Sequence, residues 1–161
     1  MAVTATALAL ATAPAALGAW AQPVASPVNL TPLTASDRSD ITVIGGVPHV
    51  AWTEPDGANT EVHVARISAD GSVWERVGEA LVPSSPINRD ALRNASGASL
   101  ADVGGVPYVA WVETDGTNRE VRVARPNAAG NGWDKVGEVL NPASPINQND
   151  ARNADDPAIV S

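Results

Sequence analysis

The chain contains no cysteine and only one lysine among its 161 residues. It therefore has no disulfide and no thiolate chemistry. Its formal net charge is −8, which argues against nucleic acid as a partner because phosphates require clustered Lys and Arg. The two histidines, His49 and His63, are replaced at the equivalent repeat positions by Tyr108 and Arg122. We therefore expect no zinc site and no cofactor.

Long hydrophobic runs are also missing, apart from an Ala- and Leu-rich beginning. That stretch is too short, and too broken by Pro14, to span a membrane. It ends in Ala19-Trp20-Ala21, a small-x-small pattern typical of signal peptidase sites. We interpret residues 1–21 as a signal peptide and expect a secreted bacterial protein. The alternative is a disordered Ala- and Pro-rich leader.

What the chain does have is an internal repeat. The segment that starts at Gly45 reads GGVPHVAWTEPDGANTEVHVAR, and it returns at Gly104 as GGVPYVAWVETDGTNREVRVAR. Trp52 recurs as Trp111 and Trp74 as Trp133, each 59 residues later. A repeat of this length is typical of arrays in which each unit buries its apolar faces against a neighbour.

Each repeat reads as four strands with no helix. The expected strands, A to D in each repeat, are residues 41–44, 47–54, 61–67 and 74–81, and then residues 99–103, 106–113, 120–125 and 133–140. Gly-Gly doublets predict tight turns after each first strand, and Asp-Gly pairs at 56–57 and 115–116 predict hairpins after each second strand. The second and third strands carry apolar or small residues on both faces, so each sheet must be covered on both sides.

Four-stranded sheets stacked face to face around an axis form a β-propeller. The fold class we expect is therefore all-β, a β-propeller fragment with four-stranded antiparallel blades and a 59-residue repeat. A β-sandwich is the alternative, although it gives no reason for a strict repeat. We divide the chain into residues 22–40 as a partial D–A region, 41–98 and 99–156 as two blades, and 157–161 as the first strand of another. Closure of a ring then requires further blades or a homo-oligomer.

The order apolar strand, Gly-Gly, two strands and Trp-x-x-Val-Gly resembles the repeat of secreted bacterial β-propellers. The Gly-Gly doublet and the late Trp are similar to those of kelch repeats. Residues 68–74 resemble the Asp-box of sialidase-like propellers, while the second copy, residues 127–133, lacks the aspartate. The resemblance implies a propeller fold, and it implies an activity only if the chain is a fragment of a sialidase-like glycoside hydrolase.

Candidate binding residues lie in the long polar D–A loops. Because strand directions alternate, these loops share one edge of the sheets with the B–C turns, and function favours loops on a rigid scaffold. Arg, Asn and Asp side chains can bind sugar hydroxyls or carboxylates. The candidates are Arg93, Asn94, Arg152, Asn153, Asn88, Asn147, Asp90 and Asp150. The alternative is that the asparagines stabilise the loops by bonding to backbone groups and that the arginines pair with Asp90 and Asp150.

No catalytic set is recognisable. The single tyrosine, Tyr108, lies in a strand and not in a loop, and no Ser-His-Asp combination is suggested. The repeated tryptophans alternate with apolar neighbours, so we interpret them as core packing and not as sugar-stacking platforms. Oxygen ligands in the Asp-Gly-x-Asn-x-Glu turns leave calcium open, although Asp-Gly is also a common hairpin turn. We expect a non-catalytic module that binds a glycan or protein ligand, or a purely structural array within a longer protein.

Overall fold

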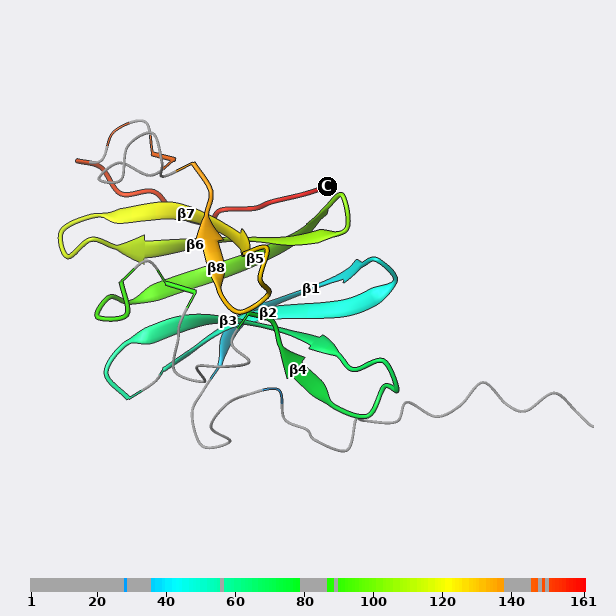
Figure 1. Cartoon of the computed structure of the whole chain (residues 1–161). Coiled ribbons are helices and arrows are strands. Elements are labelled where there is room, and N and C mark those ends of the chain that lie inside the picture. The colour runs from blue at the N-terminus through cyan, green and yellow to red at the C-terminus, as the bar shows by residue number, and fades with distance from the viewer. Residues whose placement is uncertain are drawn as a thin grey trace, which may run out of the picture.

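The computed structural model describes residues 28, 36–55, 57–78, 87–88, 90–137, 146–147, 149 and 151–161. Within them the chain is all-β, with no helix, and forms two four-stranded antiparallel sheets in which each strand pairs with the next (Figure 1). The first sheet contains β1 (Asp37–Ile44), β2 (Val47–Pro55), β3 (Thr60–Ile67) and β4 (Trp74–Arg76). The second contains β5 (Ala95–Val103), β6 (Val106–Thr114), β7 (Arg119–Pro126) and β8 (Trp133–Lys135). The predicted all-β class and four-strand order are confirmed.

The Gly-Gly turns form as predicted. Gly45 and Gly46 have φ values of 57° and 83°, and Gly104 and Gly105 have φ values of 64° and 84°. Two consecutive positive φ angles are what a tight hairpin turn requires, and glycine adopts them without strain. The β6–β7 hairpin differs from a two-residue turn because Thr114 pairs with Arg119 and leaves a four-residue loop. Asp56, in the matching β2–β3 loop, lies outside the described residues.

The starts of the first strands and the ends of the fourth strands differ from the expectation. The first strands begin earlier, at Asp37 and Ala95, because each continues through a register shift. Arg38 and Gly97 lie in these irregular segments with φ values of 44° and 67°. The fourth strands end at Arg76 and Lys135 and not at residues 81 and 140. Residues 79–81 and 138–140 lie outside the described part of the chain.

The two sheets pack face to face, with β5 against the first sheet. One cluster of buried side chains joins them, so the facing sides of the two sheets cover each other, and coverage of both sides of each sheet stays a prediction. From the first sheet it includes Ile44, Ala51, Val62 and Val64. From the second sheet it includes Leu100, Val109, Trp111 and Ala124, and Ile87 joins from the intervening loop. Trp111 is fully buried in this cluster, as the core-packing interpretation predicted.

A tryptophan, a glutamate and a cation recur together in both sheets. Trp111 Nε1 donates to the buried Glu113 carboxylate at 3.0 Å, and the Lys135 ammonium lies 5.2 Å from the indole centroid. In the first sheet Trp52 Nε1 donates to Glu54 at 3.1 Å, and the Arg76 guanidinium lies 4.4 Å from the indole centroid. The indole N–H is satisfied within the core, and the ring face attracts the cation.

The same cations connect each sheet to the chain segment before it. Arg76 Nη2 donates to the carbonyl of Val28 at 2.8 Å, and Lys135 Nζ donates to the carbonyl of Ile87. Val28 and Ile87 are one repeat apart, 59 residues. The repeat therefore recurs in space as well as in sequence.

The Asp-box-like segment forms a turn held by side chains. The Asp70 carboxylate accepts from Ser68 Oγ at 2.6 Å, Ser72 N at 3.0 Å and Ser72 Oγ at 2.7 Å. These donors lower the pKa of Asp70 to about 2, with the Ser68 hydrogen bond the largest cause. In the second repeat Asn127 Oδ1 instead accepts from Asn131 N at 3.2 Å. Asn127 stands at the repeat position of Ser68, whose Oγ accepts from Ser72 N at 3.1 Å, so the amide replaces the serine in this contact.

Residues 157–161 form no strand in this structure. Ile159 N donates to Ser99 Oγ at 3.3 Å, so the segment nevertheless runs beside β5. Its position follows the earlier repeat, in which Leu100 N donates to Asp40 Oδ2 at 2.7 Å. The two bonds join equivalent positions of successive repeats.

Candidate functional site

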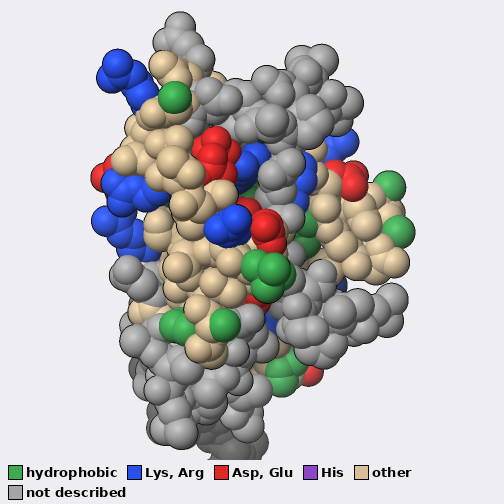
Figure 2. All heavy atoms as spheres, turned by 90° about the vertical axis from the view of Figure 1, so that its left-hand side faces the viewer, with side chains coloured by type: hydrophobic (Ala, Val, Ile, Leu, Met, Phe, Trp, Pro, Cys, Tyr) green, Lys and Arg blue, Asp and Glu red, His purple; other side chains and the backbone are tan. Residues whose placement is uncertain are grey.

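The candidate site is the edge of the two sheets that carries the β2–β3 and β6–β7 turns and the loops that follow β4 and β8. We call it the loop rim and define it by residues 57–59, 87–94, 115–118 and 146–153, except residues 89, 148 and 150, which lie outside the described part of the chain. This edge is at the left in Figure 1. Figure 2 looks onto it and shows basic and acidic side chains intermixed over its described part.

Asn88 and Asn147 use their amides to hold the loops against the third strands. Asn88 is 5% exposed, and its Oδ1 accepts from Val62 N at 2.9 Å. Its Nδ2 donates to the carbonyls of Thr60 and Arg93 at 3.1 and 3.0 Å. The equivalent bonds of Asn147 join Val121 N at 3.0 Å, Arg119 O at 3.3 Å and Arg152 O at 3.4 Å. Both amides are therefore engaged with backbone groups.

Asn94 and Asn153 make a second, equally repeated contact. Each Oδ1 accepts at 2.9 Å from the N–H that begins the third strand, that of Thr60 for Asn94 and that of Arg119 for Asn153. The carbonyl of Asn94 also accepts from Thr114 N at 3.1 Å, across to the second sheet. All four asparagines therefore contact the edges of the third strands. The side chains of Asn94 and Asn153 nevertheless remain exposed.

Asp90 is a turn cap with a nearby cation. Its carboxylate accepts from Leu92 N at 2.9 Å and lies 3.6 Å from Arg93 Nε. Its backbone N–H donates to the buried Glu113 carboxylate at 2.9 Å. In the second repeat the equivalent cap is Asn149, which accepts from Ala151 N at 3.0 Å. Sequence reasoning singled out Asp150, which lies outside the described residues, and missed Asn149 although it stands 59 residues after Asp90.

Arg93 lies against the β6–β7 turn. A Cβ placed on Gly116 would come within 2.6 Å of Arg93 Nη1, so this glycine leaves room for the guanidinium. Backbone N–H groups of Asn118 and Thr117 lower the pKa of the neighbouring Asp115 carboxyl, and Arg93 adds to the effect. Arg93 thus connects the loop of one repeat to the turn of the next, whereas Arg152 is simply exposed.

Two further arginines of this edge escaped sequence reasoning. Arg38 pairs with Asp156 at 2.5 Å, and Arg119 pairs with Asp155 at 2.6 Å. Arg38, Gly97 and Asp156 occupy one repeat position, and all three have positive φ. With these pairs the edge presents alternating donors and acceptors in place of a field of one sign.

The arginines at the ends of the third strands have different partners in the two repeats. Arg66 pairs with Glu75 and not with Glu54, and Arg125 donates to Tyr108 Oη at 3.2 Å. Glu54 and Glu113 are instead buried beneath the indole N–H groups described above.

The described residues contain no cluster of three His, Cys, Asp or Glu side chains that could hold a metal ion. His49 and His63 lie on opposite faces of the first sheet, because His49 is paired with Arg66 and His63 with Trp52. Burial lowers the pKa of His49, whose Nδ1 lies 2.8 Å from Val47 O. In the described part of the chain no helix is long and apolar enough to cross a membrane.

Comparisons with protein families, with curated proteins and with solved structures found no match to this chain. Its interpretation therefore rests on its own residues and on the repetition of their contacts.

Proposed function

We propose that the chain is a non-catalytic repeat module of the β-propeller type that binds a polar ligand, with a glycan as the leading class, on the loop rim. The observation that carries the proposal is that Asn88, Asn94, Asn147 and Asn153 bond the described parts of both loops to the edges of the third strands. A loop already ordered loses little conformational entropy when a ligand binds. The guanidinium groups of Arg93 and Arg152 are then displayed on a preorganised support.

The mixed charge of the rim favours a neutral ligand rich in hydroxyls. Arg93 of the rim, and Arg38 and Arg119 on the same edge of the sheets, each have a carboxylate within 4 Å, so this edge offers donors beside acceptors. A sugar hydroxyl both donates and accepts hydrogen bonds and suits such a surface. Single contacts of this kind contribute about 0.5–1.5 kcal/mol each. One repeat therefore binds weakly, and several repeats gain affinity through avidity.

The propeller part of the proposal is supported by contacts that recur from one repeat to the next. The bonds from Arg76 to Val28 and from Lys135 to Ile87 do so, as do those from Leu100 to Asp40 and from Ile159 to Ser99. The outer faces also carry exposed apolar side chains, among them Ile41, Val43 and Val103. We expect additional repeats or further copies to cover them, since a ring needs about four to eight blades.

The rim proposal is tested on a glycan array, followed by titration of any hit. In the Arg93→Ala/Arg152→Ala double variant we expect the affinity to fall by at least about tenfold and the unfolding midpoint to stay unchanged. The matched control is Arg66→Ala/Glu75→Ala, which removes an exposed ion pair from the opposite edge of the sheets. Unchanged affinity in the double variant, or equal losses in both, would overturn the proposal.

A purely structural array is the second candidate, and the engagement of all four asparagine side chains with backbone N–H groups favours it. In that case no hit on the glycan array depends on Arg93 or Arg152. The Arg93→Ala/Arg152→Ala variant then changes only the assembly of the chain. Light scattering of the full chain reports that assembly. A soluble monomer that stays monomeric at high concentration would contradict the need for further repeats.

Secretion is the remaining part of the proposal. Residues 1–21 lie outside the described residues, so the support is the small-x-small pattern of the sequence alone. Expression in a bacterial host should release a mature chain that begins at Gln22. An intact cytoplasmic chain that still starts at Met1 would count against it.

A further inference from the structure

The two repeats differ at the edge opposite the loop rim. In the first sheet Arg66 and Glu75 are cross-strand partners, and Arg66 Nε donates to Glu75 Oε2 at 3.3 Å. In the second sheet Arg125 and Asp134 are the equivalent partners. Aspartate is one methylene shorter than glutamate, and among the described residues no ion pair joins Arg125 to Asp134.

Arg125 has turned to a different neighbour. Its Nη1 donates to Tyr108 Oη at 3.2 Å, and Tyr108 stands where the first repeat has His49. A guanidinium carries five N–H donors, so this single bond leaves most of them available at an exposed position. The Asp134 carboxylate is exposed as well.

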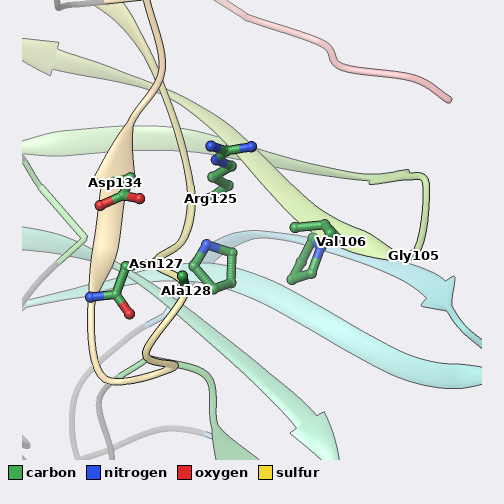
Figure 3. A pocket seen from close by; sticks show the side chains of 8 residues that line it. Gly105, Val106, Arg125, Asn127, Ala128 and Asp134 are labelled. Atoms are coloured by element: carbon green, nitrogen blue, oxygen red, sulfur yellow. The ribbon is translucent and has the colours of Figure 1, made fainter.

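A hollow of about 400 Å³ lies between these groups. Figure 3 shows Arg125 and Asp134 beside it on neighbouring strands, with Val106 and Ala128 nearby. The complete lining is Gly105, Val106, Pro107, Arg125, Pro126, Asn127, Ala128 and Asp134. It therefore combines one cation, one anion and an apolar wall formed largely by two prolines and a valine.

We propose that this hollow binds a small zwitterion, namely a free α-amino acid with an apolar side chain. The ligand carboxylate lies on the Arg125 guanidinium, whose planar fork matches it in a bidentate manner. The ligand ammonium donates to the Asp134 carboxylate. The apolar side chain then covers Val106, Pro107 and Pro126, where its burial is favourable.

Stacking of a further repeat leaves this hollow open. Arg66 and Glu75 lie on the face of the first sheet that the second sheet covers, because they share the side-chain alternation of Val64. Their side chains nevertheless remain 55% and 45% exposed. The equivalent position of the second sheet would keep similar access under another repeat. The inference thus does not depend on the proposed rim function, and it uses different residues.

The first test compares three probes on the full chain by ligand-observed NMR and calorimetry: L-leucine, N-acetyl-L-leucine and L-leucinamide. The acetylated probe lacks the cation, and the amide lacks the carboxylate. We expect leucine to bind with a Kd of about 1 mM and each derivative to bind at least about tenfold more weakly. Equal binding of all three, or no binding of leucine at concentrations well above that Kd, would overturn the proposal.

The second test uses variants that distinguish a specific binding site from a surface hollow that binds no ligand. Asp134→Glu should restore the ion pair seen in the first repeat, and it should reduce leucine binding by about tenfold although the charge is unchanged. Arg125→Gln should reduce it at least as much. The matched controls are Arg66→Gln and Glu75→Gln at the equivalent positions of the first sheet, which should leave binding unchanged. Undiminished binding in Asp134→Glu and Arg125→Gln, with unfolding midpoints equal to that of the parent chain, would refute the assignment.

Discussion

The carboxylate of Asp40 accepts a hydrogen bond from the backbone N–H of Leu100 at 2.7 Å. The same carboxylate accepts from Ser99 Oγ at 3.1 Å. Ser99 takes the place of Asp40 in the next repeat, and its hydroxyl accepts from Ile159 N at 3.3 Å. A side-chain oxygen at this position therefore holds the first strand of the following repeat, more strongly when it is charged.

The Asp40→Ala change should weaken the contact between the sheets. It leaves the Leu100 N–H without its acceptor in a partly buried place, so we expect a loss of about 1–3 kcal/mol in the free energy of unfolding. Urea denaturation measures it. Asp40→Asn is the control, because its amide oxygen can still accept, and it should lose less. Coincident denaturation curves for Asp40→Ala and the parent chain would show that the contact contributes nothing.

Gly78→Ala tests the contact of Trp133 with the end of the first sheet. A Cβ on Gly78 would lie 2.5 Å from Trp133 Nε1, which itself donates to Val77 O at 2.9 Å. The control is Gly137→Ala, one repeat later, where φ is also positive and an added Cβ meets nothing within 4 Å. Backbone strain is common to both, so we expect Gly78→Ala to destabilise by about 1–3 kcal/mol more than Gly137→Ala. Equal free energies of unfolding in Gly78→Ala and Gly137→Ala would contradict the contact between Trp133 and Gly78.

Trp111→Ala should be among the most destabilising single changes. The side chain is fully buried between the sheets, and removal of such a group costs about 3–5 kcal/mol. Trp74→Ala is the control, because Trp74 is half-buried and is not among the side chains of the core cluster. Thermal unfolding of both variants checks the difference. A Trp111→Ala protein of normal stability that has lost glycan binding would instead favour a sugar-stacking role.

The Asp70 turn predicts a dependence of stability on acidic pH. Its folded pKa of about 2 lies below the ordinary value of 3.8. The ionised carboxylate therefore stabilises the folded state above about pH 4, and this contribution is lost as the pH falls toward about 2. Asp70→Asn should show a smaller loss of Tm over that window than the parent chain. NMR titration of the Asp70 carboxyl measures the pKa directly, and an ordinary value would contradict the hydrogen bonds of this turn.

Much of the local structure could be read from the sequence. Gly45-Gly46 and Gly104-Gly105 predicted their turns because only glycine adopts consecutive positive φ angles without strain. Four antiparallel strands per repeat followed from the short apolar segments between these turns, which depend only on neighbours along the chain. The candidate rim also followed from strand direction, and its loops lie on that edge in the structure wherever they are described.

What the side chains bind was decided by tertiary structure. Asn88 was equally suited to a ligand and to the Val62 N–H, and only the packing of its loop along β3 shows which group it meets. Arg66 and Arg125 occupy the same repeat position, yet one finds Glu75 and the other Tyr108. The sequence by itself determined the repeat, the strands and the turns, because these depend on local conformation. The pairing of charges across strands and repeats depends on distances of a few ångströms between distant segments, and those distances exist only once the sheets have packed.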